Sequence, residues 1–225
     1  MNSLTEMLKT NHNKYELMID DRYGEFPNVA VVDNLILIGE KHNCPESGQL
    51  ASNICSQVDP AVFAVEQSPI YRRSKTSHIT TDSGAIEYLE GYSSTRDVPL
   101  FYIDLPADEF TEQFESAIPE IFSLYEAKLV ANEFDDPIAD SGRVTENSIS
   151  TARETVRAVL GEETYEILYT ERERYMAQQL NWLRDEFSDP VVVAIGAFHT
   201  QALVDELQSC STIQSPKELQ VYEPF

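Results

Sequence analysis

Cysteine, lysine and long apolar runs are all scarce in this 225-residue chain. Its three cysteines form no Cys-x-x-Cys pair, which argues against a disulfide framework and a structural zinc site and favours a reducing compartment. No stretch approaches the roughly 18 apolar residues that a membrane span requires, and the polar first thirty residues do not resemble a signal peptide. We therefore expect a soluble, cytoplasmic protein without a membrane span.

Basic residues are also few. The chain has 16 Lys and Arg against 39 Asp and Glu, which gives a formal net charge of -23. A field of this sign repels phosphate backbones and anionic lipids, so we expect no nucleic-acid partner. The acids lie along the whole chain rather than in one tail, which is typical of cytosolic proteins from halophilic organisms. We interpret the charge as a surface adaptation and look for function elsewhere.

The remaining composition is that of a folded domain. Apolar residues make up 42% of the chain, which is enough for a core, and no internal repeat or low-complexity block divides it. We expect residues 1–225 to form a single domain. Residues 1–26 are polar and lightly patterned, which indicates an N-terminal arm or a short helix.

Short apolar runs alternate with stretches of helical spacing. The first two runs, 29–32 and 35–38, flank Asp33 and Asn34, and they indicate either two strands joined by a tight turn or one interrupted strand. Later patterns predict buried strands at 61–65, 98–103, 191–195 and 219–222, and helices at 47–58, after Ser83 and at about 200–208.

The order of these elements predicts the fold class. Strands and helices alternate at spacings that fit parallel crossovers. Residues from about 107 to 187 are almost entirely helical in pattern, with a break near 135–142. We therefore predict an α/β fold: a central mixed, mainly parallel sheet with flanking helices and a helical insertion before the last strands. The long helices leave a homodimer open.

The motif Gly-x-x-His follows a predicted strand twice. Gly39 and His42 end one strand, and Gly196 and His199 end another. Glycine lets the chain leave a sheet tightly, and each imidazole is then presented beyond the carboxyl ends of the strands, where α/β proteins bind ligands. Either histidine alone is more often a core residue. Together, two histidines in one crevice can share a divalent metal ion or divide acid and base roles.

Charged side chains accompany both histidines. Glu66 ends the strand at 61–65, where a charge is costly unless it is paired or binds a metal, and it should emerge beside His42 if their strands are neighbours. Glu40 lies within the first motif and is either a site residue or a solvated loop acid. Arg72 follows Glu66 and either binds a substrate carboxylate or carbonyl or compensates the acidic surface.

A later helical segment carries two more candidates. Its apolar residues fall on one stripe at helical spacing, and Arg172 and Glu173 lie at opposite edges of that stripe. Glu171 and Arg174 point away from it. Arg172 and Glu173 therefore either form a wall of the site or pair with neighbouring helices.

Taken in order, these signals resemble the TraB/PrgY/GumN/Tiki superfamily and its erythromycin-esterase-like relatives. The shared pattern is a strand into Gly-x-x-His, a strand into Val-Glu with an arginine soon after, a helix with Glu-Arg-(Asp/Glu)-Arg-Tyr-Met-Ala, and a strand into Gly-Ala-x-His. In this chain the four parts are Gly39 to His42, Val65 and Glu66 with Arg72, Glu171 to Ala177, and Gly196 to His199.

The resemblance implies a mixed-sheet α/β fold. In characterised branches it also implies divalent-metal-dependent peptide cleavage or ester hydrolysis, and other branches are linked to the shutdown of peptide pheromones. The family's Glu-Arg pair aligns with Glu171 and Arg172. Helical spacing turns Glu171 outward, so either Glu173 takes the inward position or the helix is bent.

The leading hypothesis is a metal-assisted hydrolase of a peptide amide or an ester. His42, Glu66 and His199 would hold a divalent ion, for which Mn, Co and Zn are all suitable. Such an ion lowers the pKa of bound water and polarises the substrate carbonyl.

The remaining candidates take the other roles of a hydrolase. Glu40 or Glu173 would act as the general base, and Arg172 or Arg72 would bind the oxyanion or a substrate carboxylate. Two alternatives stay open on the same residues. One is a non-catalytic protein that sequesters a short peptide or small ligand, and the other is a metal-free histidine esterase.

Overall fold

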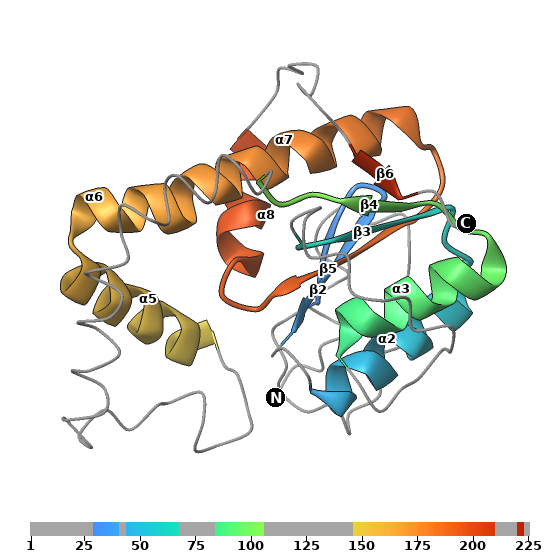
Figure 1. Cartoon of the computed structure of the whole chain (residues 1–225), viewed down its shortest axis with the longest axis horizontal. Coiled ribbons are helices and arrows are strands. Elements are labelled where there is room, and N and C mark those ends of the chain that lie inside the picture. Colours follow the sequence, from blue (N-terminus) through green and yellow to red (C-terminus); the bar gives the residue numbers. More distant parts are fainter. Residues whose placement is uncertain (1–28, 41–43, 68–83, 106–145, 210–219, 223–225) are drawn as a thin grey trace.

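The computed structural model describes residues 29–40, 44–67, 84–105, 146–209 and 220–222 (Figure 1). These residues contain a six-stranded sheet in the order β1-β2-β5-β3-β4-β6. The four inner strands are parallel, and β1 and β6 pair antiparallel at the two edges. The strands are β1 (Val29–Val32), β2 (Leu35–Glu40), β3 (Val62–Val65), β4 (Leu100–Tyr102), β5 (Val191–Gly196) and β6 (Gln220–Tyr222). The predicted α/β class with a mixed, mainly parallel sheet is confirmed.

The first two strands form a hairpin. Val32 pairs with Leu35 across the turn, and Asp33 takes a positive φ of 55°. Aspartate tolerates this left-handed conformation better than most residues. Asn34 then donates its side-chain amide to the carbonyl of Phe187 at 2.5 Å, which ties the turn to the chain just before β5. Of the two predicted arrangements, the tight turn is therefore the one present.

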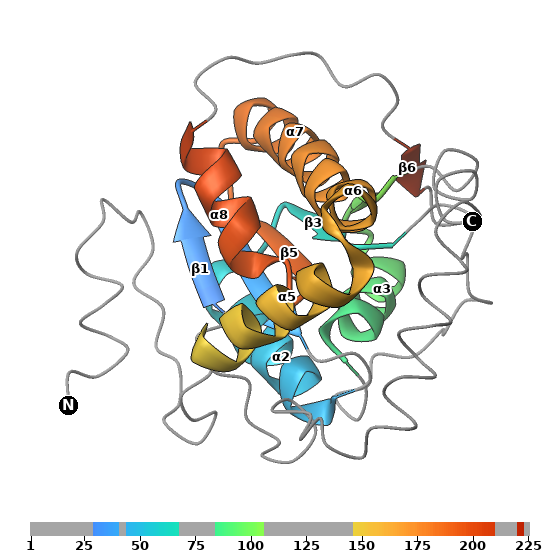
Figure 2. The ribbon, with the colours of Figure 1, turned by 90° about the vertical axis from the view of Figure 1, so that its left-hand side faces the viewer.

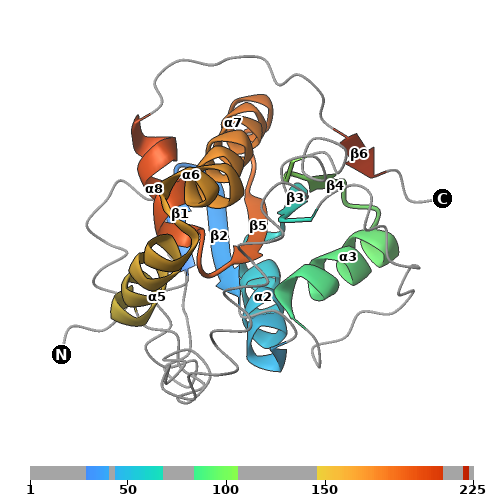
Figure 3. The same cartoon turned by 60° about the vertical axis from the view of Figure 1, so that its left-hand side comes forward.

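Helices cover both faces of the sheet. On one face lie α2 (Pro45–Val58) and α3 (Ala85–Arg96), and on the other lie α7 (Glu171–Glu186) and α8 (Thr200–Ser209) (Figure 3). Successive residues of a strand point to opposite faces, so Ile36 packs toward α2 and α3 and Leu37 toward α7 and α8. Because both faces are covered, the inner strands are apolar throughout rather than alternating.

A run of helices precedes β5. It consists of α5 (Glu146–Leu160), α6 (Glu162–Tyr165), a π-helical turn η3 (Glu166–Thr170) and α7. α5 and α6 lie at the end of the molecule toward which the parallel strands point (Figures 1 and 2). The described part of the predicted helical insertion is therefore helical. Its predicted break at 135–142 and the predicted N-terminal arm lie outside the described residues.

The position of β5 decides which side chains meet. β5 enters the sheet between β2 and β3 and pairs in parallel with both of them. Glu66 was expected beside His42 on the condition that β2 and β3 are neighbours, and this condition is not met. The helix that follows β3 covers one face, and the helix that follows β5 covers the other. Such a change of side between adjacent parallel strands opens the edge where α/β proteins place ligands.

Within the described residues, no helix is both long and apolar enough to cross a membrane.

Candidate active site at the carboxyl edge of the sheet

Three adjacent strands deliver the polar residues of the site. β3 leads into Glu66, β4 leads into Asp104 two residues beyond its end, and β5 leads through Gly196 into His199. The Glu66 carboxylate reaches across to the neighbouring strand, where its Oε2 accepts the Gly196 N–H at 2.6 Å. Parallel pairing thus brings residues together that are 130 positions apart in the sequence.

A short turn places His199 at the start of α8. The His199 N–H donates to the carbonyl of Gly196 at 2.9 Å, and the His199 carbonyl accepts the N–H of Leu203 at 3.0 Å. The backbone of His199 is therefore fixed on one side by the strand end and on the other by the first turn of the helix. Its side chain is 6% exposed.

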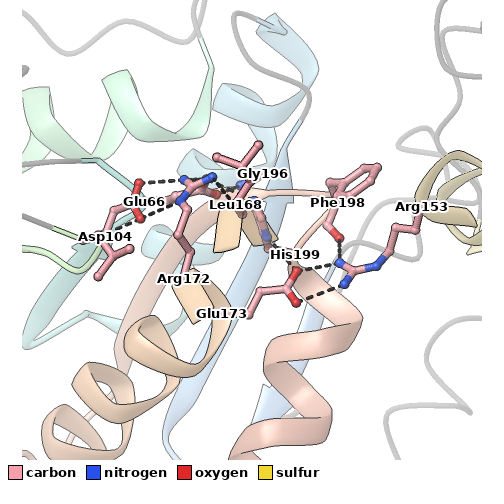
Figure 4. Close-up of polar contacts among 10 residues, drawn as sticks. Glu66, Asp104, Arg153, Leu168, Arg172, Glu173, Gly196, Phe198 and His199 are labelled. Carbon is pink, nitrogen blue, oxygen red and sulfur yellow. Dashed lines mark hydrogen bonds and ion pairs between the residues drawn. The ribbon is translucent and has the colours of Figure 1, made fainter. Parts of the chain in front are cut away.

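The imidazole of His199 lies between two carboxylates (Figure 4). Its Nδ1 is 2.8 Å from Oε1 of Glu173, and its Nε2 is 3.4 Å from Oε1 of Glu66. An ionised carboxylate can only accept hydrogen bonds, so the short contact assigns the Nδ1 proton to His199, donated to Glu173. In the neutral ring, Nε2 then carries the lone pair and faces Glu66.

Arg153 of α5 holds the carboxylate of Glu173. Its two terminal nitrogens donate to Oε1 and Oε2 of Glu173 at 2.6 and 3.0 Å, and one of them also donates to the carbonyl of Phe198 at 2.7 Å. Burial acts to raise the pKa of Glu173, but the hydrogen bonds from His199 and Arg153 outweigh it and the net pKa is lowered. Glu173 is therefore a carboxylate at neutral pH.

Arg172 of α7 joins the other carboxylates. Its Nε and Nη2 donate to the two oxygens of Asp104 at 3.0 and 2.7 Å, and Nη2 also donates to Oε1 of Glu66 at 3.0 Å. Its Nη1 donates to the carbonyl of Leu168, which lies in the π-helical turn, at 3.4 Å. π-helical turns are frequent at functional sites. Burial acts to lower the pKa of Arg172. Asp104 and Glu66 raise it by more than burial lowers it, so the net pKa is raised and the guanidinium stays charged.

The charges of this cluster do not balance. Three carboxylates, those of Glu66, Asp104 and Glu173, face the guanidinium groups of Arg153 and Arg172. Counted over the described residues, and with a neutral imidazole, the cluster therefore carries one excess negative charge. A proton on Nε2 of His199, or a bound cation, would neutralise it.

Aromatic rings close one side of the imidazole. Tyr169 lies 5.9 Å from the His199 ring and 5.1 Å from the Phe198 ring, and it stacks on Tyr165 at 4.9 Å. Burial raises the pKa of Tyr169, so its hydroxyl stays protonated. His199 is buried beside these rings, and electrostatic interactions are stronger in such a low-dielectric setting than in water.

Glu40 also lies at the carboxyl edge of the sheet, and its carboxylate accepts hydrogen bonds from the start of α3. It is buried, and its Oε2 accepts the backbone N–H groups of Ala85 and Ile86, at 3.1 Å for Ile86. These are the first residues of α3, where a negative charge satisfies unpaired N–H groups and the helix dipole. Glu40 is therefore not a solvated loop acid, and in the structure its carboxylate serves a helix start.

The structure brings together four of the seven predicted site residues: Glu66, Arg172, Glu173 and His199. Glu66 lies against His199, because its strand β3 is the neighbour of β5. Glu173 is buried and faces the site, whereas Glu171 is exposed, as helical spacing indicated. His42 and Arg72 lie outside the described residues.

Sequence reasoning missed two members of the cluster. Asp104 directly follows the predicted strand at 98–103, so the rule that selected Glu66 could have found it. Arg153 had no such signal, since it lies in the middle of a helix far from any strand end. Its role depends on how α5 packs.

A divalent metal ion can be tested against these residues. Among the residues that the structure describes, no three His, Cys, Asp or Glu side chains are grouped so that they could hold a metal ion. Two ligand atoms are nevertheless suitably spaced. Nε2 of His199 and Oε1 of Glu66 are 3.4 Å apart, close to the roughly 3.3 Å between two ligands at about 2.0 Å from a tetrahedral ion. His42, the third predicted ligand, lies outside the described part of the chain.

Fold and site together define an α/β protein with a histidine–carboxylate cluster at the carboxyl edge of its sheet. In comparison with known proteins, no protein-family model, curated protein or solved structure matches the chain.

Proposed function

We propose that this protein is a hydrolase of ester or peptide amide bonds in which His199 is the general base. One observation carries the proposal: a buried carboxylate, Glu173, fixes Nδ1 of His199 at 2.8 Å and leaves Nε2 as the basic nitrogen. In hydrolases, a carboxylate in this position holds the imidazole in the correct tautomer and stabilises the imidazolium that forms.

The proposed reaction uses His199 twice. Nε2 accepts a proton from water as the water oxygen attacks the carbonyl carbon, and a tetrahedral oxyanion forms. The imidazolium then returns the proton to the leaving oxygen or nitrogen as the bond to carbon breaks. Glu66, 3.4 Å from Nε2, stabilises the imidazolium between these steps, and protonation removes the excess negative charge of the cluster.

Arg172 supplies a fixed positive charge next to the reacting nitrogen. Its guanidinium is held in one orientation by Asp104 and Glu66 and is 15% exposed. A preorganised cation of this kind stabilises negative charge that develops on a carbonyl oxygen, or binds a substrate carboxylate. In this proposal Glu66 and Asp104 therefore also hold the guanidinium of Arg172 in position.

A divalent metal is the second candidate for activating water, and the spacing of Nε2 of His199 and Oε1 of Glu66 favours it. His199, Glu66 and the predicted ligand His42 would hold the ion. When bound, it would lower the pKa of a water molecule and polarise a carbonyl. In that case Glu173 would orient a ligand histidine, as carboxylates commonly do at metal sites.

The test compares His199→Asn with a control, His78→Asn, which changes a histidine outside the two Gly-x-x-His motifs. Hydrolysis of p-nitrophenyl acetate and of a mixed peptide library is followed with and without a chelator. We expect His199→Asn to lose at least about 100-fold in rate, the scale of a missing general base, and the control to match the unchanged protein.

The outcomes separate the hypotheses. Activity that survives the chelator and depends on His199 supports the metal-free base. Activity lost with the chelator, together with bound metal that falls in His42→Ala and His199→Ala, supports the metal-assisted form. If His199→Asn retains full activity, the proposal is wrong. Saturable peptide binding without any product supports the sequestering alternative.

A further inference from the structure

Arg153 connects a peripheral helix to the centre of the site. It lies in α5, which packs at the end of the molecule rather than on a face of the sheet (Figure 2). Its guanidinium is bidentate to Glu173, and it also donates to the carbonyl of Phe198, the residue directly before His199. One side chain therefore holds both the partner of the imidazole and the backbone that carries it.

The guanidinium is itself fixed by packing. It lies over the Phe198 ring at 5.2 Å and over the Tyr165 ring at 5.7 Å, distances at which a cation is attracted to an aromatic face. The planar fork of an arginine matches the two oxygens of a carboxylate, which sets the plane of Glu173 and not only its charge. A lysine cannot set this plane, because it offers a single ammonium.

We propose that Arg153 is a positioning residue for His199, acting through Glu173 and the Phe198 carbonyl, so that docking of α5 sets the tautomer and the orientation of the imidazole. This inference rests on the proposed role of His199 as the base. Without the two hydrogen bonds from Arg153, the Glu173 carboxylate is free to rotate. Nδ1 of His199 then no longer has an acceptor oxygen at a fixed position. Both neutral tautomers of His199 are then populated.

Arg157 provides a matched control on the same helix. Its guanidinium also lies over the Tyr165 ring, at 4.5 Å, but its ion pair is with Glu162 of α6 and its side chain is 51% exposed. Arg157→Met therefore removes an arginine from α5 and a cation from Tyr165 without touching Glu173. Arg153→Met keeps an aliphatic side chain against the two rings and removes the fork.

The primary readout is spectroscopic and independent of turnover. In protein labelled with 15N-histidine, spectra are recorded over a pH series that extends until the ring signals stop changing, and the ring nitrogens of the neutral form report which of them carries the proton. The His199 signals are identified by their absence in His199→Gln. We expect the Nδ1–H form alone in the unchanged protein and in Arg157→Met, and a mixture of both tautomers in Arg153→Met.

The kinetic readout follows from the same cause. With p-nitrophenyl acetate, Arg153→Met lowers kcat by about tenfold or more with KM little changed, the scale seen when an outer partner of a functional histidine is lost. Arg153→Lys is expected to show an intermediate tautomer mixture and an intermediate kcat.

An unchanged Nδ1–H signal in both Arg153 variants, or in Arg153→Lys if Arg153→Met does not fold, overturns the inference. If the tautomer shifts but the unchanged protein hydrolyses neither ester nor peptide, the positioning role stands and the proposed hydrolase function fails. The two failures are therefore distinguishable.

Discussion

His199 is held by two carboxylates whose own partners differ. Glu173 receives a bidentate guanidinium and a ring N–H, whereas Glu66 receives a backbone N–H and one nitrogen of Arg172. The carboxylate of Glu173 therefore orients the imidazole ring of His199. The carboxylate of Glu66 lies 3.4 Å from Nε2, where it would stabilise the charge that the proposed mechanism places on this nitrogen.

The pairing of Glu173 predicts a pH-dependent contribution to stability. Its folded pKa is lowered, so the contribution is fully present above the unfolded value of about 4.3 and is lost as the pH falls through the folded pKa. Glu173→Gln should lower the free energy of unfolding by about 3–5 kcal/mol at pH 7, because Arg153 is left without its carboxylate. The difference should shrink below about pH 4.

Urea unfolding of both proteins at several pH values measures this difference. Glu171→Gln is the matched control, since Glu171 is two positions away on the same helix but exposed. It should change the free energy of unfolding by no more than about 0.5 kcal/mol. A Glu173→Gln effect that is equally large at pH 7 and pH 3.5 would contradict the assigned ionisation.

At the scale of elements, the carboxyl edge is where strand ends meet helix starts. Glu40 ends β2 and satisfies the first N–H groups of α3, and His199 follows β5 and directly precedes α8. The N-terminus of α3 has Gly84 as its N-cap, and this residue makes no side-chain cap hydrogen bond. A carboxylate from another element therefore replaces the missing local cap.

This replacement can be tested by removing the charge. Glu40→Gln keeps the shape of the side chain but weakens two N–H acceptor contacts and the interaction with the helix dipole. We expect a loss of about 1–2 kcal/mol in the free energy of unfolding. Glu46→Gln, an exposed acid in the first turn of α2, should have a clearly smaller effect. Equal effects of the two changes would show that Glu40 does not cap α3.

The π-helical turn is also an element-scale feature. It lies between α6 and α7 and presents the Leu168 carbonyl to Arg172 and the Tyr169 ring to His199. Helical spacing in the sequence describes a regular helix through this region. Directly after this turn, Arg172 of α7 binds Asp104 and Glu66, which follow two distant strands.

At the scale of the whole molecule, the charge of -23 opposes folding. Like charges on a compact protein repel each other, and the repulsion is screened over about 10 Å at 0.1 M salt but over about 3 Å at 1 M. The thermal unfolding midpoint should therefore rise steadily between 0.05 and 1 M NaCl.

Differential scanning fluorimetry measures this midpoint. Sucrose at the same osmolality is the control, because excluded solutes also favour compact states without screening charge. A rise in NaCl that does not exceed the rise in sucrose would contradict electrostatic self-repulsion as the cause.

Much of the architecture could be predicted from local patterns. The strand at 191–195, the helix at 200–208 and the hairpin around Asp33 are each specified by a few adjacent residues, because apolar runs and turn residues act locally. The same holds for Glu66 and His199, which directly follow buried strands. The inward side of Glu173 followed from the helical period.

What the sequence alone determined is therefore which residues stand at strand ends and which face a helix turns inward. The tertiary structure alone decided that β5 separates β2 from β3, so that Glu66 meets His199, and that α5 brings Arg153 to Glu173. The physical reason is that strand order and helix docking depend on contacts between residues far apart in the chain, and no local spacing records them.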